Sequence, residues 1–256
     1  MIIERLARLG YASIGIVYMI VGGFAVAAGL GQRGRAGSQS DAFAFILEQP
    51  FGRAVLIAIA LGLCGYVLWR FTSAVADDEH RGNDAKGLGI RVASFGRGLI
   101  YAALAVEAAR MSMRRGGGGG QGGEQQTQHW TARLMDAPFG RWLLALAGLG
   151  VIGYGAFQLY LAWDSKLSKR IRLGEIDGRV RRKVIAISRF GIGARGVVFV
   201  VIGGSLLLAA VKHNPGAAHS TTGALQELPL PMLIVVGFGL ASYGVYAMVN
   251  ARYRKM

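Results

Sequence analysis

The sequence predicts an all-helical polytopic membrane protein, with six transmembrane helices arranged as three parallel two-helix repeats. Apolar residues make up 53% of the 256 residues and gather into long uncharged runs. These runs recur as a repeat along the chain, and a fixed repeat of this kind sets the architecture on which every local motif must lie. Basic residues are concentrated in alternate loops, as in proteins that cross a bilayer several times. Together these observations favour a membrane protein over a soluble protein with one large core.

The repeat becomes visible when the first halves of the three copies are aligned. Residues 8–24 read RLGYASIGIVYMIVGGF, residues 189–205 read RFGIGARGVVFVVIGGS, and residues 91–107 read RVASFGRGLIYAALAVE. The second halves begin at 49, 137 and 228. Because each copy has an even number of spans, all three insert the same way up. We therefore expect an axis along the membrane normal with approximate threefold symmetry.

The predicted spans differ in length and apolar character. Residues 11–30, 142–163 and 228–251 carry no charge and are long enough to cross a hydrocarbon layer of about 30 Å. The runs 54–69 and 196–211 are shorter and reach the membrane surface if Arg70 and Arg195 snorkel. The span at 98–106 is the weakest, because Glu107 and Arg110 interrupt it. It is predicted from its place in the repeat.

Each pair of spans is expected to be joined by a short interfacial helix in an external loop. These helices are predicted at 41–50, 129–138 and 223–229, where an acidic residue stands two positions before a proline that ends the helix. Ser40 and Thr222 are the expected N-caps of the first and third. Residues 116–128 are rich in glycine and lack apolar anchors, which predicts a mobile tether.

The repeat divides the chain into three membrane segments and two linkers. The predicted boundaries are repeat 1 at 1–76, a cytoplasmic linker at 77–90, repeat 2 at 91–163 with a polyglycine external loop at 116–123, a basic cytoplasmic linker at 164–186, and repeat 3 at 187–256.

The net charge of +15 is informative through its distribution. Most of the 29 lysines and arginines fall in the segments before the first span, between repeats and after the last span, which predicts cytoplasmic N- and C-termini. Anionic lipid headgroups are the expected partners of the basic segment 166–183. Nucleic acid is excluded as a partner, because no aromatic residues alternate with these basic ones.

The second helix of each repeat presents small residues followed by aromatic residues on one helix face. The spacing i, i+3, i+4, i+7 places each set on the same side. We interpret these faces as helix-packing seams. A central ligand site surrounded by the three tyrosines is the alternative. The three sets are Gly62, Gly65, Tyr66 and Trp69, then Gly150, Gly153, Tyr154 and Phe157, and finally Gly239, Ser242, Tyr243 and Tyr246.

Glu107 is the charged residue that stands out in the predicted spans. The other two copies have Phe24 and Ser205 at its position. A carboxylate at this depth is costly and therefore suggests a function, such as a proton or cation role. The structural alternative is a local pair with Arg110, three residues further along the helix, with both side chains snorkelling.

No catalytic, cofactor or metal site is expected. The four histidines lie in predicted loops without metal-ligand spacing, and the single cysteine, Cys64, has no partner for a disulfide. Residues 191–196 satisfy GxGxxG but open a membrane helix instead of following a strand, which argues against dinucleotide binding. Because no nucleophile, base and orienting group fall on neighbouring faces, we predict that the protein is not an enzyme.

The repeated Arg-x6-Gly-x2-Tyr/Phe starts at Arg8, Arg91 and Arg189, together with the Gly/Ser-Tyr-x2-aromatic ends, resemble a bacterial membrane family catalogued as domain of unknown function 1206. The resemblance covers nearly the whole chain. It implies a multi-pass protein of the bacterial inner membrane, and the family name implies no settled activity.

Two classes of function agree with these features. The first is a non-catalytic scaffold or accessory subunit that packs against lipid or a larger membrane protein complex, and the scarcity of polar residues in the spans favours it. The second is a small-solute or ion transporter or channel that uses the pseudo-threefold axis and Glu107.

Overall fold

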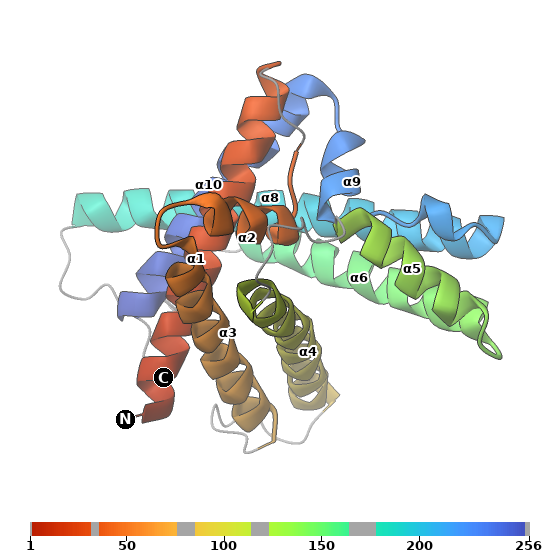
Figure 1. Ribbon diagram of the computed structural model, residues 1–256, viewed down its shortest axis with the longest axis horizontal. Helices are drawn as coiled ribbons and strands as arrows, with labels where there is room; N and C mark the ends of the chain where they lie inside the picture. The colour runs from red at the N-terminus through yellow and green to blue at the C-terminus, as the bar shows by residue number, and fades with distance from the viewer. Residues whose placement is uncertain (1, 32–35, 76–84, 114–122, 164–177, 254–256) are drawn as a thin grey trace. The chain divides into compact units, whose positions relative to one another are not determined.

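The computed structural model describes residues 2–31, 36–75, 85–113, 123–163 and 178–253, and these residues form helices and connecting turns without a β-strand (Figure 1). The all-helical prediction is confirmed. The helices are α1 (Ile2–Gly29), α2 (Gln39–Glu48), α3 (Gly52–Val75), α4 (Ala85–Met113), α5 (Gly123–Met135), α6 (Gly140–Trp163), α8 (Gly178–Lys212), α9 (Thr221–Gln226) and α10 (Leu230–Tyr253), with a 3-10 turn η1 at Pro215–Ala217.

Within the described residues, five helices are long and apolar enough to cross a membrane. These stretches are Ala7–Gly29, Gly52–Thr72, Gly140–Trp163, Arg181–Lys212 and Leu230–Tyr253. Helix α4 is continuous over 29 residues, but it is less apolar, because Arg97, Glu107 and Arg110 interrupt its sequence. The membrane character of the chain is therefore confirmed, whereas the sixth span stays a prediction.

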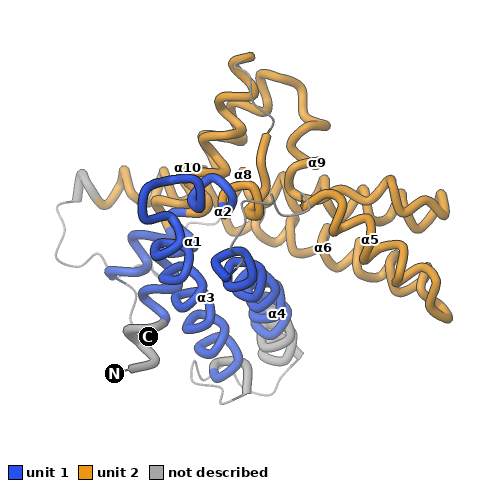
Figure 2. Tube along the Cα trace, in the orientation of Figure 1, with its two compact units in different colours: residues 1–16, 43–117, 247–256 blue, residues 17–42, 118–246 orange. Residues whose placement is uncertain are grey.

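The chain forms two compact units (Figure 2). Unit 1 comprises residues 1–16, 43–117 and 247–256, and in it α3 packs along α4. Unit 2 comprises residues 17–42 and 118–246, and in it α6 packs along α8. Each helix pair joins the second helix of one repeat to the first helix of the next repeat.

Glycines let the backbones of α6 and α8 approach each other closely. A Cβ atom added to Gly203 would lie 2.7 Å from the carbonyl oxygen of Gly148, and one added to Gly155 would lie 2.8 Å from the carbonyl oxygen of Gly196. Any larger residue at these positions has to push the helices apart. Because lipid is as apolar as the side chains, such close packing is what holds membrane helices together.

The same contact recurs between α1 and α10 within unit 2. A Cβ atom added to Gly22 would lie 2.6 Å from the carbonyl oxygen of Gly237 and 2.5 Å from the amide nitrogen of Ala241. In the repeat alignment, Gly22 corresponds to Gly203 and Gly237 to Gly148. The second helix of one repeat and the first helix of another thus meet in the same register twice.

The two helices of a single repeat meet at a second recurrent contact. In unit 1, a Cβ atom added to Gly10 would lie 2.5 Å from the Cβ atom of Tyr66. In unit 2, one added to Gly191 would lie 2.3 Å from the amide nitrogen of Tyr243. The alignment pairs Gly10 with Gly191 and Tyr66 with Tyr243, so repeats 1 and 3 are packed alike.

The short helices form in the predicted loops, but the predicted caps are wrong. Ser40 lies inside α2, and Ser38 caps that helix by exchanging hydrogen bonds with Asp41. The N-cap of α9 is Ser220, whose hydroxyl accepts a hydrogen bond from the amide of Thr222. In both helices the serine two residues before the predicted cap reaches the free amides, as N-cap geometry requires.

The tether is predicted at residues 116–128, but α5 already begins at Gly123. Residues 123–128 are therefore helical. The remainder of the polyglycine loop, 116–122, lies outside the described residues, as do 77–84 of the first linker and 164–177 of the basic linker.

The adjacent glycines Gly203 and Gly204 provide a matched test of the α6 and α8 contact. Alanine raises helix propensity at both positions. At Gly204 an added Cβ atom meets no described atom within 4 Å, whereas at Gly203 it meets the α6 backbone. We expect Gly203→Ala to lower the free energy of unfolding by about 1–3 kcal/mol and Gly204→Ala not to lower it, measured by thermal unfolding in detergent micelles. Equal unfolding midpoints in the two variants would contradict the close contact.

Candidate functional site

The predicted face of α3 is buried in unit 1. Gly62, Gly65, Tyr66 and Trp69 all lie in the interior. On α10, Gly239 is buried, whereas Ser242, Tyr243 and Tyr246 are half-buried. These two faces contact the first helix of the same repeat, as a packing seam does.

The corresponding face of α6 differs. Gly150, Gly153 and Phe157 are exposed in unit 2, and Tyr154 is half-buried. The residues that α6 buries against its own unit are on another side of the helix, and they include Leu144, Gly148, Gly155 and Gln158. The repeat pattern thus indicates equivalent positions, but it does not indicate which of them are covered in each unit.

An arginine is buried among aromatic rings in unit 1. Arg70 is only 6% exposed, so its side chain does not reach the surface of the unit. Its Nε donates a hydrogen bond to the hydroxyl of Tyr66 at 2.8 Å and its Nη2 to that of Tyr11 at 3.3 Å. The guanidinium carbon lies 4.5 Å from the ring centroid of Trp69. Aromatic faces and hydroxyl oxygens replace the water that the arginine would otherwise seek. Arg70 therefore joins α1 and α3.

A second arginine is buried in the same manner in unit 2. Arg195 is also 6% exposed and donates a hydrogen bond to the hydroxyl of Tyr243. Its guanidinium carbon lies 4.6 Å from the ring centroid of Tyr243, 5.0 Å from that of Phe199 and 5.2 Å from that of Tyr18. Its side chain, like that of Arg70, is surrounded by protein groups and does not reach the surface of the unit. Arg195 joins α8, α10 and α1.

Arg195 lies well inside its helix. Six residues before it, Arg189 donates hydrogen bonds to the carbonyl oxygens of Ala162 and Trp163 at the end of α6. Six residues correspond to about 9 Å along the helix axis. Arg195 lies far from both ends of α8 (Gly178–Lys212), so protein groups must solvate its charge.

Each of the three tyrosines on the predicted faces packs edge-on against an aromatic residue of another repeat. Edge-to-face geometry places the positive rim of one ring over the negative face of the other. Both interpretations of these faces, a packing seam and a central ligand site, stay predictions. The pairs are Tyr66 with Tyr101, Tyr154 with Phe199, and Tyr243 with Tyr18, with centroid separations of 4.9, 5.2 and 4.8 Å.

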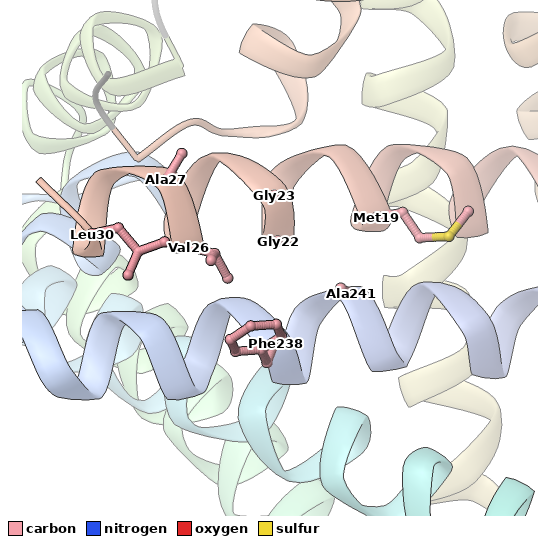
Figure 3. Close-up of a pocket in the computed structure, with 8 residues that line it drawn as sticks. All are labelled: Met19, Gly22, Gly23, Val26, Ala27, Leu30, Phe238 and Ala241. Carbon is pink, nitrogen blue, oxygen red and sulfur yellow. The ribbon is translucent and has the colours of Figure 1, made fainter. Parts of the chain in front are cut away.

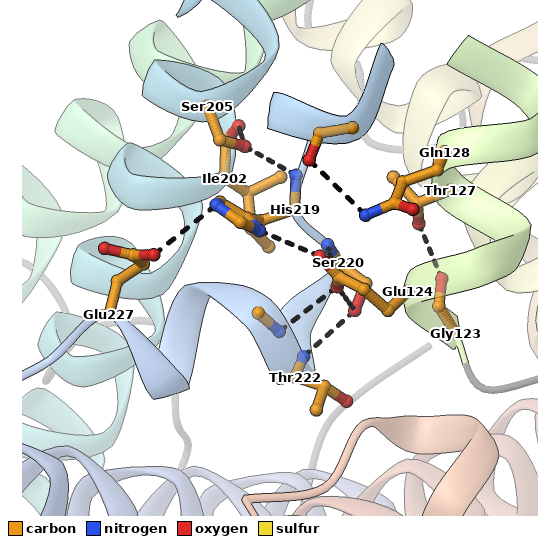
Figure 4. Close-up of polar contacts among 12 residues, drawn as sticks. Gly123, Glu124, Thr127, Gln128, Ile202, Ser205, His219, Ser220, Thr222 and Glu227 are labelled. Atoms are coloured by element: carbon orange, nitrogen blue, oxygen red, sulfur yellow. Dashed lines mark hydrogen bonds and ion pairs between the residues drawn. The ribbon is translucent and has the colours of Figure 1, made fainter. Parts of the chain in front are cut away.

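The short helices of unit 2 are joined by a polar cluster that we call the loop clasp (Figure 4). Glu124, in the first turn of α5, accepts hydrogen bonds from the hydroxyl and amide of Ser220 and from the amide of Gly223. The carboxylate thus satisfies free amides at the start of α9. The loop clasp consists of Asp41, Glu124, Ser205, His219, Ser220, Thr222 and Glu227.

Further contacts extend the loop clasp to α8 and α2. The amide of His219 donates to the hydroxyl of Ser205 at 2.9 Å, and Ser205 belongs to α8. The hydroxyl of Thr222 donates to Asp41 of α2 at 3.1 Å. Four helices of unit 2 are consequently linked at one place.

Glu124 stays ionised in the loop clasp. Burial alone would raise the pKa of its carboxyl, but hydrogen bonds from Ser220 and His219 outweigh burial and lower the pKa below the ordinary value of a glutamate. A lowered pKa in the folded state means that the contribution of Glu124 to stability is present above its unfolded pKa. This contribution is lost as the pH falls through the lower folded value.

Glu107 and Arg110 lie on α4 as predicted from the repeat. Glu107 is half-buried and Arg110 is exposed. Both interpretations of Glu107 remain predictions. In the described part of the chain, no three His, Cys, Asp or Glu side chains are grouped so that they could hold a metal ion.

An apolar groove runs between α1 and α10 in unit 2 (Figure 3). Its volume is about 280 Å³, and its lining contains no polar side chain, so it suits an apolar group and not a charged substrate. The lining residues are Met19, Gly22, Gly23, Val26, Ala27, Leu30, Phe238 and Ala241.

Neither the arginine clusters nor the loop clasp was predicted from the sequence, although the spacing of arginine and aromatic residues indicates the arginine clusters. Arg70 follows Tyr66 by four residues and Arg195 precedes Phe199 by four, a spacing that places cation and ring side by side on a helix. Glu124 gave no such signal, because it stands beside the polyglycine run and its partners are almost 100 residues away.

Replacing Arg195 by lysine tests whether the guanidinium is required. An ammonium group has no planar fork and cannot cover three rings at once. We expect Arg195→Lys to lower the free energy of unfolding in micelles by about 2 kcal/mol, whereas Arg182→Lys, at an exposed position of the same helix, leaves it unchanged. If both variants unfold at the same temperature, the aromatic cluster does not depend on arginine.

Comparisons with known proteins agree with the repeat. The profile of the family described as Domain of Unknown Function (DUF1206) matches three segments, residues 9–77, 92–164 and 190–254. The chain is also similar to the Uncharacterized protein YxxB of Bacillus subtilis (strain 168), with 32% identity over 261 residues, covering 99% of this chain and 92% of that protein. No solved structure matches. The three matched segments coincide with the three two-helix repeats of the sequence, and the chain belongs to the DUF1206 family.

Proposed function

We propose that the protein is a non-catalytic membrane scaffold or accessory subunit that packs against lipid or a larger membrane complex. The observation that supports the proposal is that the interior polar groups contact other parts of the protein. Arg70 and Arg195 hold helices together through aromatic rings, and the carboxylate of Glu124 caps a helix. Groups engaged in this way stabilise a fixed framework, and no substrate is needed to explain them.

The proposed framework has six spans, with α4 as the sixth, arranged as three parallel repeats about a pseudo-threefold axis. The recurrent glycine contacts support this arrangement, because Gly22 with Gly237 and Gly203 with Gly148 meet in the same register. Divergence in repeat 2 accounts for the lower apolar character of α4.

We place the protein in the bacterial inner membrane with both termini in the cytoplasm. The concentration of lysine and arginine between repeats supports this orientation. The basic linker would then lie against anionic headgroups of the inner leaflet.

The outer faces of the helices are the proposed contact surface for lipid or a partner. Large apolar side chains are exposed along α6 at Leu146, Leu149, Tyr160 and Trp163. A patch of this kind is expected on a helix that faces lipid or another membrane protein.

Purification in native lipid followed by mass spectrometry tests the proposed role. A scaffold or accessory subunit should be recovered with a stoichiometric membrane partner, because the exposed helix faces have to be covered. We expect at least one such partner at a constant ratio across independent preparations, with an unrelated six-span protein from the same membrane as the control. Recovery of this chain with lipid alone in every preparation would contradict the accessory-subunit role and favour the transporter or channel.

A transporter or channel is the second candidate, and the half-buried carboxylate of Glu107 in α4 is the observation that favours it. Under this alternative, Glu107→Gln should abolish ion or proton flux into liposomes, because the neutral amide cannot bind a cation or exchange a proton. Arg110→Gln, one turn further along α4, is the matched control. Flux that is unchanged in Glu107→Gln would remove Glu107 from the mechanism.

A further inference from the structure

We propose that the loop clasp is a pH-sensitive latch, in which uptake of a proton by His219 tightens the link between α5 and the segment that carries α9. Histidine is the side chain whose charge ordinarily changes between pH 5 and 8. The proposal rests on the position of His219 between two carboxylates on opposite sides of its ring.

The two nitrogen atoms of His219 face different glutamates. Nδ1 lies 2.8 Å from Oε1 of Glu124, which is a hydrogen bond, and Nε2 lies 3.6 Å from Oε1 of Glu227. His219 is 25% exposed and Glu124 28%, whereas Glu227 is 63% exposed. The pair of His219 with Glu124 is thus partly buried and hydrogen-bonded, whereas the pair of His219 with Glu227 lies at the protein surface.

The protonation state decides what the outer nitrogen does. Since an ionised carboxylate only accepts hydrogen bonds, Nδ1 carries the proton that faces Glu124. In a neutral ring Nε2 then presents a lone pair to the carboxylate of Glu227, which is unfavourable. A proton taken up from water converts Nε2 into a donor and gives His219 a positive charge between two negative ones. Both contacts then become charge-assisted.

The loop clasp contains further polar groups from the elements packed around His219. Asp41 of α2 adds a third carboxylate, linked to α9 through the hydroxyl of Thr222. From α8, the contact is the neutral hydroxyl of Ser205. The charged groups of the loop clasp that lie beside His219 are therefore Glu124 and Glu227, whereas Asp41 is linked to α9 through Thr222.

Tightening affects backbone groups as well as side chains. The amides of Ser220 and Gly223 donate to Glu124, and the amide of His219 donates to Ser205. When His219 is neutral, the segment around η1 and α9 is held less firmly, and these amides open more often. That the latch responds to the pH outside the cell rests on the proposed topology, whereas the pH response itself does not.

Hydrogen exchange of the full-length protein in micelles measures this opening directly. We expect protection of the amides at 219–223 to rise about threefold between pH 8 and pH 5.5, after correction for intrinsic exchange rates, which is the range of an exposed ion pair. This window stays above the pKa of Glu124, so the inner carboxylate remains charged throughout.

Glu227→Gln removes the outer carboxylate and should reduce the pH response while leaving the fold intact, because Glu227 is exposed and the inner pair of His219 with Glu124 remains. Asp136→Asn is the matched control, since Asp136 is also exposed and also stands two residues before a proline. His219→Gln should eliminate the response entirely.

Two results would overturn the latch. One is a wild-type protection that is the same at both pH values, and the other is a full pH response in Glu227→Gln. If His219→Gln fails to fold, Glu227→Gln still decides the question. A latch that fails while a stoichiometric partner is recovered leaves the scaffold proposal standing, so the two failures are distinguishable.

Discussion

Close approach of helix backbones at glycine is the contact on which the rest of this structure depends. Lipid gives apolar helices no reason to associate, so stabilisation comes from dispersion contacts that require the backbones to be near each other. Gly203 with Gly148 and Gly22 with Gly237 provide such contacts in unit 2. Once the helices are this close, aromatic residues on neighbouring turns must interlock, and the edge-on pairs at Tyr18 and Tyr154 follow from that spacing.

The buried arginines show how a membrane protein can keep a cation away from water. A guanidinium has several donors and a flat face, and both features are used at Arg70 and Arg195. Hydroxyl oxygens accept its hydrogen bonds and rings cover its faces. Glycine contacts bring the helices close together, and the arginines stabilise this packing further. The two arginines stand at positions that do not correspond in the repeat, yet each is held by tyrosine hydroxyls and aromatic rings within its unit.

The loop clasp extends the same logic to the ends of the helices. The start of α9 has free amides, and a carboxylate from α5 satisfies them across a long sequence separation. Placing His219 beside that carboxylate makes the cap responsive to protonation. The long helices of unit 2 are thus joined by uncharged backbone contacts and the buried cation of Arg195, whereas its loops are joined by hydrogen bonds to carboxylates.

The sequence by itself determined the helical class, the repeat, the membrane character and the family, because long apolar runs and a fixed period are local or periodic properties of the chain. It also placed the short helices, whose proline stops are local, although it misplaced the caps of α2 and α9 by two residues each. Only the tertiary structure decided that Arg70 and Arg195 are buried, that the exposed and buried faces of α6 differ from those of α3, and that Glu124 meets Ser220. These outcomes depend on which side chains from distant segments surround a residue, and neither period nor composition carries that information.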